Sequence, residues 1–343
     1  MKTPILAAMI WASAAAHSAP LVLERSIPLP GVEGRIDHFA HDSAGHRLFV
    51  AALGNNSVEV LDLSQGKPIH RITGLTEPQG IYFLGESNRL YVANGGDGTV
   101  RVFDGSSYAP VTTLKTDDDA DNLRYDASAK LLYVGHGSGA LGAIDVGKNA
   151  VVADISLKAH PESFQLEKAG QRVFVNVPGA HHIAVVDRNK KVVTAIWSIG
   201  LAGANFPMAL DEANHRLMVA CRAPACVLVF DTESGKEVAK VDLHGDCDDL
   251  FFDARRRQLY ASCGEGFIDV FEQKDPDHYV LTEAAKTAAK ARTAFFDGEH
   301  LYLAVPRRGD QRAEVRCYRI EEQVDRSDEK ASSTGRQGPR QPE

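Results

Sequence analysis

A pattern of 41 to 44 residues repeats seven times along the chain and limits what this chain can fold into. Each unit has an apolar strand ending at a marker position, a strand such as RLYVAN, a Gly-rich loop, a strand such as TVRVFD and a fourth strand after a polar turn. The seven marker positions are Asp42, Leu84, Asp126, Glu167, Asp211, Asp253 and Asp297. Four short strands at this period are the signature of a propeller blade, so the sequence predicts an all-β, seven-bladed β-propeller.

The two ends of the repeat array predict how the ring closes. The seventh unit lacks a fourth strand, because the chain turns polar after Ile320. An apolar segment at Leu21–Leu29 precedes the first unit, and we expect it to complete the last blade and remove its exposed edge. The predicted organisation is therefore a propeller over residues 20–320, preceded by a signal peptide over 1–19 and followed by a disordered tail over 321–343.

The N-terminal segment and the charge bear on location. Lys2, the apolar stretch from Ile5 to Ala16 and the small residues before Pro20 are typical of a secretory signal peptide, which predicts a periplasmic or secreted protein. No later segment has 18 consecutive apolar residues, so no membrane span is expected. The net charge of −8 argues against general binding to nucleic acid or to an anionic membrane surface.

The second unit resembles a known family. Its residues Tyr91–Asn94, followed by Thr99–Asp104, are similar to the repeat of the YVTN family of bacterial β-propellers, which includes YncE-like periplasmic proteins. The resemblance extends over all seven units, although the fourth departs at Val177, the last position of its motif. It implies a secreted propeller and supplies no agreed catalytic residues, so function has to be argued from the site.

Polar residues recur five positions before each marker, where the first strand of a blade reaches the channel. This column contains Asp37, Gln79, Asp121, Glu162, Phe206, Asp248 and Arg292. The next column contributes His38, Asn122 and Asp249. Because equivalent positions of the blades converge on the channel, the sequence predicts a ligand-binding site at one mouth, made by Asp37, His38, Gln79, Asp121, Asn122, Glu162, Asp248, Asp249 and Arg292.

The carboxylates in this ring suit a divalent cation such as Ca2+, which takes six to eight oxygen ligands. The predicted metal ligands are Asp37, Asp121, Glu162 and Asp248. The alternative is that these groups line a water-filled channel. Arg292 counts against the metal, because it can pair with Asp248 or Asp249, or receive an anionic ligand.

Other polar residues have simpler interpretations. The loops joining second and third strands are expected at the same mouth, with Arg222 and Glu265 among their residues. His181 and His182 are adjacent and would point to opposite faces, so they are not expected to bind one metal together. The third strands of five units end in aspartates that we interpret as turn caps: Asp62, Asp104, Asp145, Asp187 and Asp231.

Five cysteines in an exported chain invite pairing. Cys247 and Cys263 are expected side by side on neighbouring strands, and Cys221 and Cys226 across a hairpin, so both pairs are predicted disulfides. Cys317 is predicted to be a buried free thiol. The alternative is that Cys221, Cys247 and Cys263 converge on a soft metal.

Two classes of function follow. The favoured hypothesis is a non-enzymatic, monomeric, exported module that binds a small polar ligand or another exported protein at the acidic channel face, because no nucleophile, base and orienting group are recognisable. The alternative is a metal-dependent hydrolase or lyase, by analogy with propeller lactonases. A cation would then lie at the channel mouth, and His38 would be the candidate base.

Overall fold

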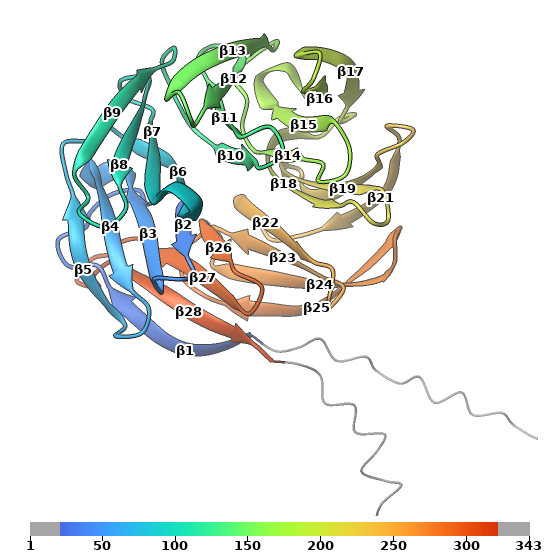
Figure 1. Ribbon diagram of the computed structural model, residues 1–343. Helices are drawn as coiled ribbons and strands as arrows, with labels where there is room; N and C mark the ends of the chain where they lie inside the picture. The colour runs from blue at the N-terminus through green and yellow to red at the C-terminus, as the bar shows by residue number, and fades with distance from the viewer. Residues whose placement is uncertain (1–20, 322–343) are drawn as a thin grey trace, which may run out of the picture.

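The chain folds into seven four-stranded antiparallel sheets around a central channel (Figure 1). The computed structural model describes residues 21–321. The predicted seven-bladed β-propeller is confirmed. The predicted signal peptide lies outside the described residues, and so does the predicted tail apart from Glu321.

Each blade runs from an innermost strand at the channel to an outermost strand at the rim. Blade 1 consists of β2 (Phe39–Asp42), β3 (Arg47–Ala52), β4 (Ser57–Asp62) and β5 (Lys67–Ile72). Blade 2 consists of β6 (Pro78–Leu84), β7 (Arg89–Asn94), β8 (Thr99–Asp104) and β9 (Pro110–Lys115). Blade 3 consists of β10 (Leu123–Asp126), β11 (Leu131–His136), β12 (Ala140–Asp145) and β13 (Ala150–Ser156). Within residues 21–321, three short 3-10 helices lie at η1 (Leu53–Asn55), η2 (Gly85–Ser87) and η3 (Pro178–Ala180).

The remaining blades repeat this plan. Blade 4 consists of β14 (Phe164–Leu166), β15 (Arg172–Val177), β16 (His182–Asp187) and β17 (Val192–Ser198). Blade 5 consists of β18 (Gly203–Asp211), β19 (Arg216–Ala223), β20 (Ala225–Asp231) and β21 (Glu237–Asp242). Blade 6 consists of β22 (Cys247–Asp253), β23 (Gln258–Cys263), β24 (Phe267–Asp275) and β25 (His278–Lys286). Blade 7 consists of β26 (Ala294–Phe296), β27 (His300–Val305), β28 (Glu314–Ile320) and β1 (Leu21–Pro28).

The core lies between the blades. Within residues 21–321 the buried apolar side chains form seven clusters, and each cluster joins two neighbouring blades. The second strand of a blade packs on both faces, which explains why β7 is buried at five consecutive residues. The outermost β17 instead alternates between exposed and half-buried residues, as expected for a strand with one solvent face.

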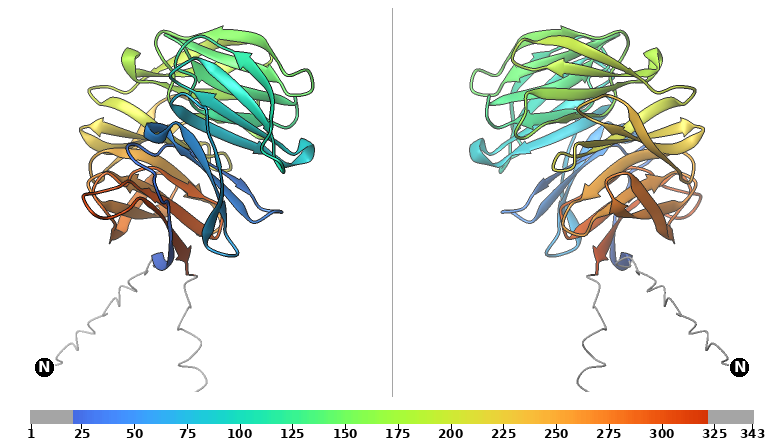
Figure 2. Two further views of the ribbon diagram at one scale, coloured as in Figure 1. Left: turned by 90° about the vertical axis from the view of Figure 1, so that its left-hand side faces the viewer. Right: turned by 90° about the vertical axis from the view of Figure 1, so that its right-hand side faces the viewer.

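Ring closure follows the prediction. The N-terminal β1 pairs antiparallel with β28, with Leu21 opposite Ile320 and Pro28 opposite Glu314. The blue β1 and the red-brown β28 lie side by side in Figure 1 and in both side views of Figure 2. Ile27 is fully buried in the cluster between blades 7 and 1, so the first strand contributes to the core as well as to the sheet edge.

The aspartates that end the third strands cap the turns that follow, as predicted. Asp187, for example, accepts hydrogen bonds from the backbone N–H groups of Asn189 and Lys190. The equivalent aspartates of four other blades accept backbone bonds in the same way. Separately, no helix among the described residues has the length and apolar character needed to cross a membrane.

Candidate functional site

Arg35 lies among the four predicted metal ligands at the channel mouth. Its Nη2 is 2.7 Å from Oδ2 of the buried Asp37. Burial acts to lower the pKa of Arg35, but the charges of Asp37, Asp248, Asp121 and Glu162 together outweigh this effect and raise it. The guanidinium therefore supplies, inside the acidic ring, positive charge of the kind that a cation would bring.

Asp248 is held by two further arginines. Arg222, near the end of β19 rather than in the loop where it was expected, donates from Nη2 to Oδ1 of Asp248, and Nε of Arg292 lies 2.9 Å from Oδ2. Both arginines also reach Asp246, at 3.4 and 2.6 Å. The guanidinium of Arg222 stacks over the ring of Phe206 at 4.1 Å from its centroid. Arg292 was expected to pair with Asp248 or Asp249, and the structure shows the pair with Asp248.

The carboxylates of Asp121 and Glu162 have less nearby positive charge than those of Asp37 and Asp248. Burial raises the pKa of Asp121 to about 7, and repulsion from Glu162 and Asp37 adds to the effect while His38 opposes it. Burial, followed by repulsion from Asp248 and Asp37, raises the pKa of Glu162 to about 8. Nε2 of His38 lies 3.8 Å from Oδ1 of Asp121 and 3.6 Å from Oδ1 of Asp37, so an imidazole from blade 1 reaches a carboxylate of blade 3.

These contacts test whether the predicted cation site fits. Asp37 and Asp248 are already engaged by guanidinium groups, which leaves Asp121 and Glu162 as the less engaged oxygens. Within residues 21–321, no three His, Cys, Asp or Glu side chains are arranged to hold a metal ion. The donor set therefore does not fit a Ca2+ site built from four free carboxylates.

Gln79 and Asn122 have supporting positions beside the ring. Nε2 of Gln79 donates to Oδ1 of Asp119 at 2.9 Å and so links blade 2 to the segment that leads into blade 3. The buried Asn122 donates from Nδ2 to Oδ2 of Asp121 at 3.4 Å, and its own Oδ1 has no hydrogen-bond partner in the part of the chain that the structure describes. These contacts orient ring residues.

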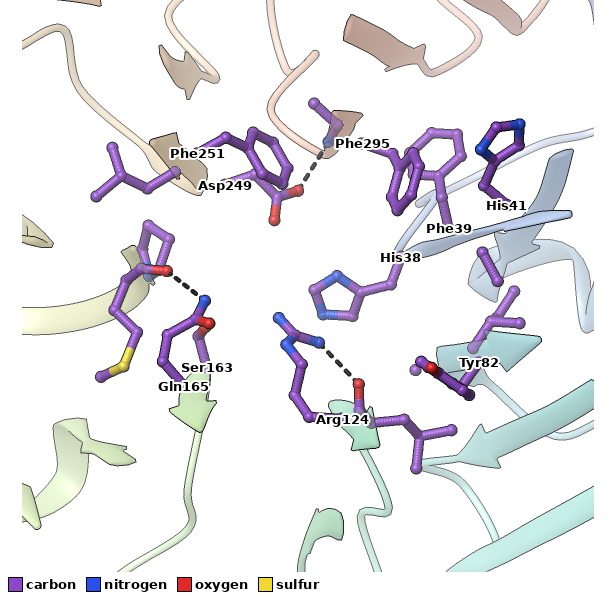
Figure 3. A pocket seen from close by; sticks show the side chains of 18 of the residues that line it. His38, Phe39, His41, Tyr82, Arg124, Ser163, Gln165, Asp249, Phe251 and Phe295 are labelled. Carbon is purple, nitrogen blue, oxygen red and sulfur yellow. Dashed lines mark hydrogen bonds between the residues drawn. The ribbon is translucent and has the colours of Figure 1, made fainter. Parts of the chain in front are cut away.

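A cavity of about 310 Å3 lies deeper in the channel. Figure 3 shows side chains from different blades pointing into it, with Arg124, Gln165 and Asp249 as its polar groups and His38 beside them. Its apolar lining includes Phe39, Tyr82, Phe83, Leu250, Phe251 and Phe295. Of the predicted ligand-binding residues, His38 and Asp249 are the two that line this cavity.

Sequence reasoning missed Arg124 and Gln165, which are among the polar groups of the cavity. Both lie two positions before a marker, in a column that also holds Tyr82, Phe251 and Phe295. Side chains two residues apart on a strand point to the same face. Asp249, four positions before its marker, therefore shares a face with the residue two positions before the marker, which is the column that holds Arg124 and Gln165. Likewise, Arg35 lies two residues before Asp37 and was missed for the same reason.

Several loop residues behave as expected for the mouth. Glu265, between β23 and β24, accepts the backbone N–H of Gly245, which precedes β22. Arg307, between β27 and β28, pairs with Glu33. His181 is exposed whereas His182 is buried, in agreement with their predicted opposite orientations.

The cysteine pairs are in register. Cys247 lies opposite Cys263 on β22 and β23, and Cys221 lies opposite Cys226 on β19 and β20. All five cysteines, including Cys317, are buried free thiols in the structure, so the two disulfides stay predictions. The proposed convergence on a soft metal is wrong: Cys221 packs between blades 4 and 5, whereas Cys247 and Cys263 pack between blades 5 and 6.

No protein family and no curated protein match this chain. Solved structures do match. A chain of the Kuenenia stuttgartiensis hydrazine synthase aligns with a TM-score of 0.70 at 16% identity, covering 80% of this chain and 95% of that chain. A chain from the crystal structure of the mitotic checkpoint complex aligns with a TM-score of 0.76 at 14% identity, covering 94% and 100%. At these identities the similarity establishes the β-propeller fold, a common binding scaffold, and nothing finer.

Proposed function

We propose that this protein is an exported binding module that takes up a small ligand in the cavity of its central channel. The observation that carries this proposal is the convergence of Arg124, Gln165 and Asp249, from three different blades, on one cavity with aromatic walls. A concave, mostly apolar site with a few well-placed polar groups is the usual form of a small-molecule site.

The ion pairs of the mouth support binding by a preformed site. Asp37 is held by Arg35, and Asp248 by Arg222 and Arg292, which keeps the rim above the cavity in one arrangement. A ligand that enters such a site does not have to order it first, and the binding free energy is reduced less by lost conformational entropy.

Export is supported by the sequence. The first 19 residues have the pattern of a signal peptide, and the repeat resembles that of the YVTN family of periplasmic propellers. Fractionation of cells that express the full chain with a C-terminal tag tests this part. We expect a shortened chain in the exported fraction, and full-length protein confined to the cytoplasm would contradict it.

Binding in the cavity is tested by filling it. Ser163 lines the cavity, so Ser163→Phe should occupy part of its volume. The matched control is Ser26→Phe on the exposed outer face of β1, far from the channel. Ligand-observed NMR with a panel of small aromatic and polar compounds should show binding to the wild type and to Ser26→Phe, and a loss for Ser163→Phe. A panel that binds all three proteins equally would locate binding elsewhere and contradict the proposal.

A further inference from the structure

Arg124 stands out because its guanidinium points into the cavity with most of its hydrogen-bonding capacity unused. Within residues 21–321 its one side-chain hydrogen bond runs from Nη1 to the backbone carbonyl of Leu123, at 2.9 Å, and it forms no ion pair there. The guanidinium carbon of Arg124 lies over the ring of Phe164, 5.8 Å from its centroid. A guanidinium carries five N–H donors, and leaving them unpaired away from water is costly. Arg124 is half-buried, so its unused donors face the cavity, where the described residues offer them no further acceptor.

Asp249 faces the same cavity but does not neutralise Arg124. One of its oxygens, Oδ2, accepts the backbone N–H of Ala294 at 2.7 Å, and no ion pair to Arg124 is formed among the described residues. Arg124 remains charged, because a guanidinium does not lose its proton in proteins even where burial lowers its pKa. Arg124 is thus a permanent positive charge in the cavity wall that forms no ion pair among the described residues.

The acidic ring above does not repel an anion as strongly as its composition indicates. Three arginines of the mouth, Arg35, Arg222 and Arg292, are paired with its carboxylates. Asp37 and Asp248, two carboxylates of this ring, thus have their charges offset by guanidinium groups before an anion reaches Arg124.

The remaining walls select the body of the ligand. Phe39, Phe251, Phe295 and Tyr82 surround the polar groups (Figure 3). Such walls bind an apolar or aromatic group by excluding water, while Arg124 offers the planar, two-pronged donor arrangement that matches a carboxylate.

From this arrangement we infer that the cavity binds an organic carboxylate, with the carboxylate on Arg124 and an aromatic or other apolar body against the phenylalanine walls. This inference rests on the proposed function and specifies its ligand class.

Three probes of related shape test the ligand class. Phenylacetate carries the charge and the ring, phenylacetamide is its neutral counterpart, and acetate lacks the ring. Calorimetric titration of the wild type should show phenylacetate binding at least tenfold more tightly than either of the other two, since a charge-assisted hydrogen bond and a buried ring each contribute at least that much.

Two variants locate the preference. Arg124→Gln should lose the preference for phenylacetate over phenylacetamide, whereas Arg89→Gln, which removes an arginine on β7 that pairs with Asp104, should keep it. Because Arg124 forms no ion pair with any described residue, its removal should not lower the melting temperature. If Arg124→Gln does not fold, the comparison of phenylacetate with phenylacetamide on the wild type still tests the inference.

The outcomes separate the two proposals. Equal affinity of acid and amide on the wild type, or a preference that survives in Arg124→Gln, overturns the carboxylate inference and leaves a binding site in the cavity. If no probe binds the wild type, or if Ser163→Phe leaves binding unchanged, the proposed function fails and the ligand class fails with it.

Discussion

Replacing Asp121 with asparagine removes an ionisable carboxyl from a buried position where its charged form is unfavourable. Asp121 is buried at the channel mouth, and within residues 21–321 its Oδ1 has no hydrogen-bond partner. Nε2 of the His38 imidazole lies 3.8 Å from this oxygen. Asparagine has nearly the same shape and stays neutral at every pH, so Asp121→Asn isolates the free energy of ionising this carboxyl.

The sign follows from proton linkage. An unfolded aspartate has a pKa of about 3.9, whereas burial raises that of Asp121 to about 7 in the folded protein. The folded state therefore holds its proton between these values, and stability falls as the pH rises from about 4 to about 7. Each pKa unit is worth about 1.4 kcal/mol, which limits the total loss to about 4 kcal/mol. For a chain of about 300 residues this corresponds to a change in melting temperature of about 6 °C.

Thermal unfolding at pH 4.5, 6 and 8 checks the prediction. Asp121→Asn should melt within about 2 °C of the wild type at pH 4.5 and up to about 6 °C higher at pH 8, where the wild type bears the full cost of the buried charge. The control is Asp118→Asn, three residues away and exposed, which should follow the wild type throughout. A gain that is equal at pH 4.5 and pH 8, or a loss at pH 8, would refute the reasoning.

Three further predictions concern the mouth, the cysteines and ring closure. Arg35→Met should destabilise the protein by about 1–3 kcal/mol in urea denaturation, since it leaves the buried Asp37 without its partner, and a double-mutant cycle with Asp37→Asn should recover most of this loss. Peptide mapping without reduction of protein from the exported fraction should link Cys247 to Cys263, a closed loop worth about 3 kcal/mol, and free thiols at both would contradict it. A chain that lacks residues 21–28 should lose at least about 5 kcal/mol, from the β1 hydrogen bonds and the burial of its apolar residues, whereas unchanged urea denaturation would show that closure contributes nothing.

The fold could be predicted from the sequence because its evidence is repeated. Each marker position has six counterparts, so an irregular one such as Leu84 does not obscure the period. The closing strand could be predicted for a different reason: one blade lacked a fourth strand, and the apolar Leu21–Leu29 was the one segment left to supply it. Both inferences rest on the rule that sheet edges and apolar faces have to be covered.

The site could be predicted only in part, because its chemistry is not repeated. Asp37, Asp121 and Asp248 share one column, and that column does converge on one mouth. Arg35 and Arg124 each occur in a single blade, at positions where the other blades carry different residues. Nothing in a repeat indicates that one arginine will meet the carboxylates of three other blades. Inspection of every second residue along the first strands would have found both arginines, but their partners depend on contacts across the channel.

Ring closure and the charge of the mouth are connected through the segment that links β1 to β2. Within residues 29–38 the backbone N–H of Leu29 bonds to Ala313 of blade 7, and the backbone carbonyl of Arg35 accepts the N–H of Gly54 in blade 1. The carbonyl of Ile36 accepts a hydrogen bond from Thr293, again of blade 7. The segment is thus fixed to both blades at the joint where the two ends of the propeller meet. Because it carries Arg35 between these anchor points, the position of the guanidinium inside the acidic ring depends on the ring being closed.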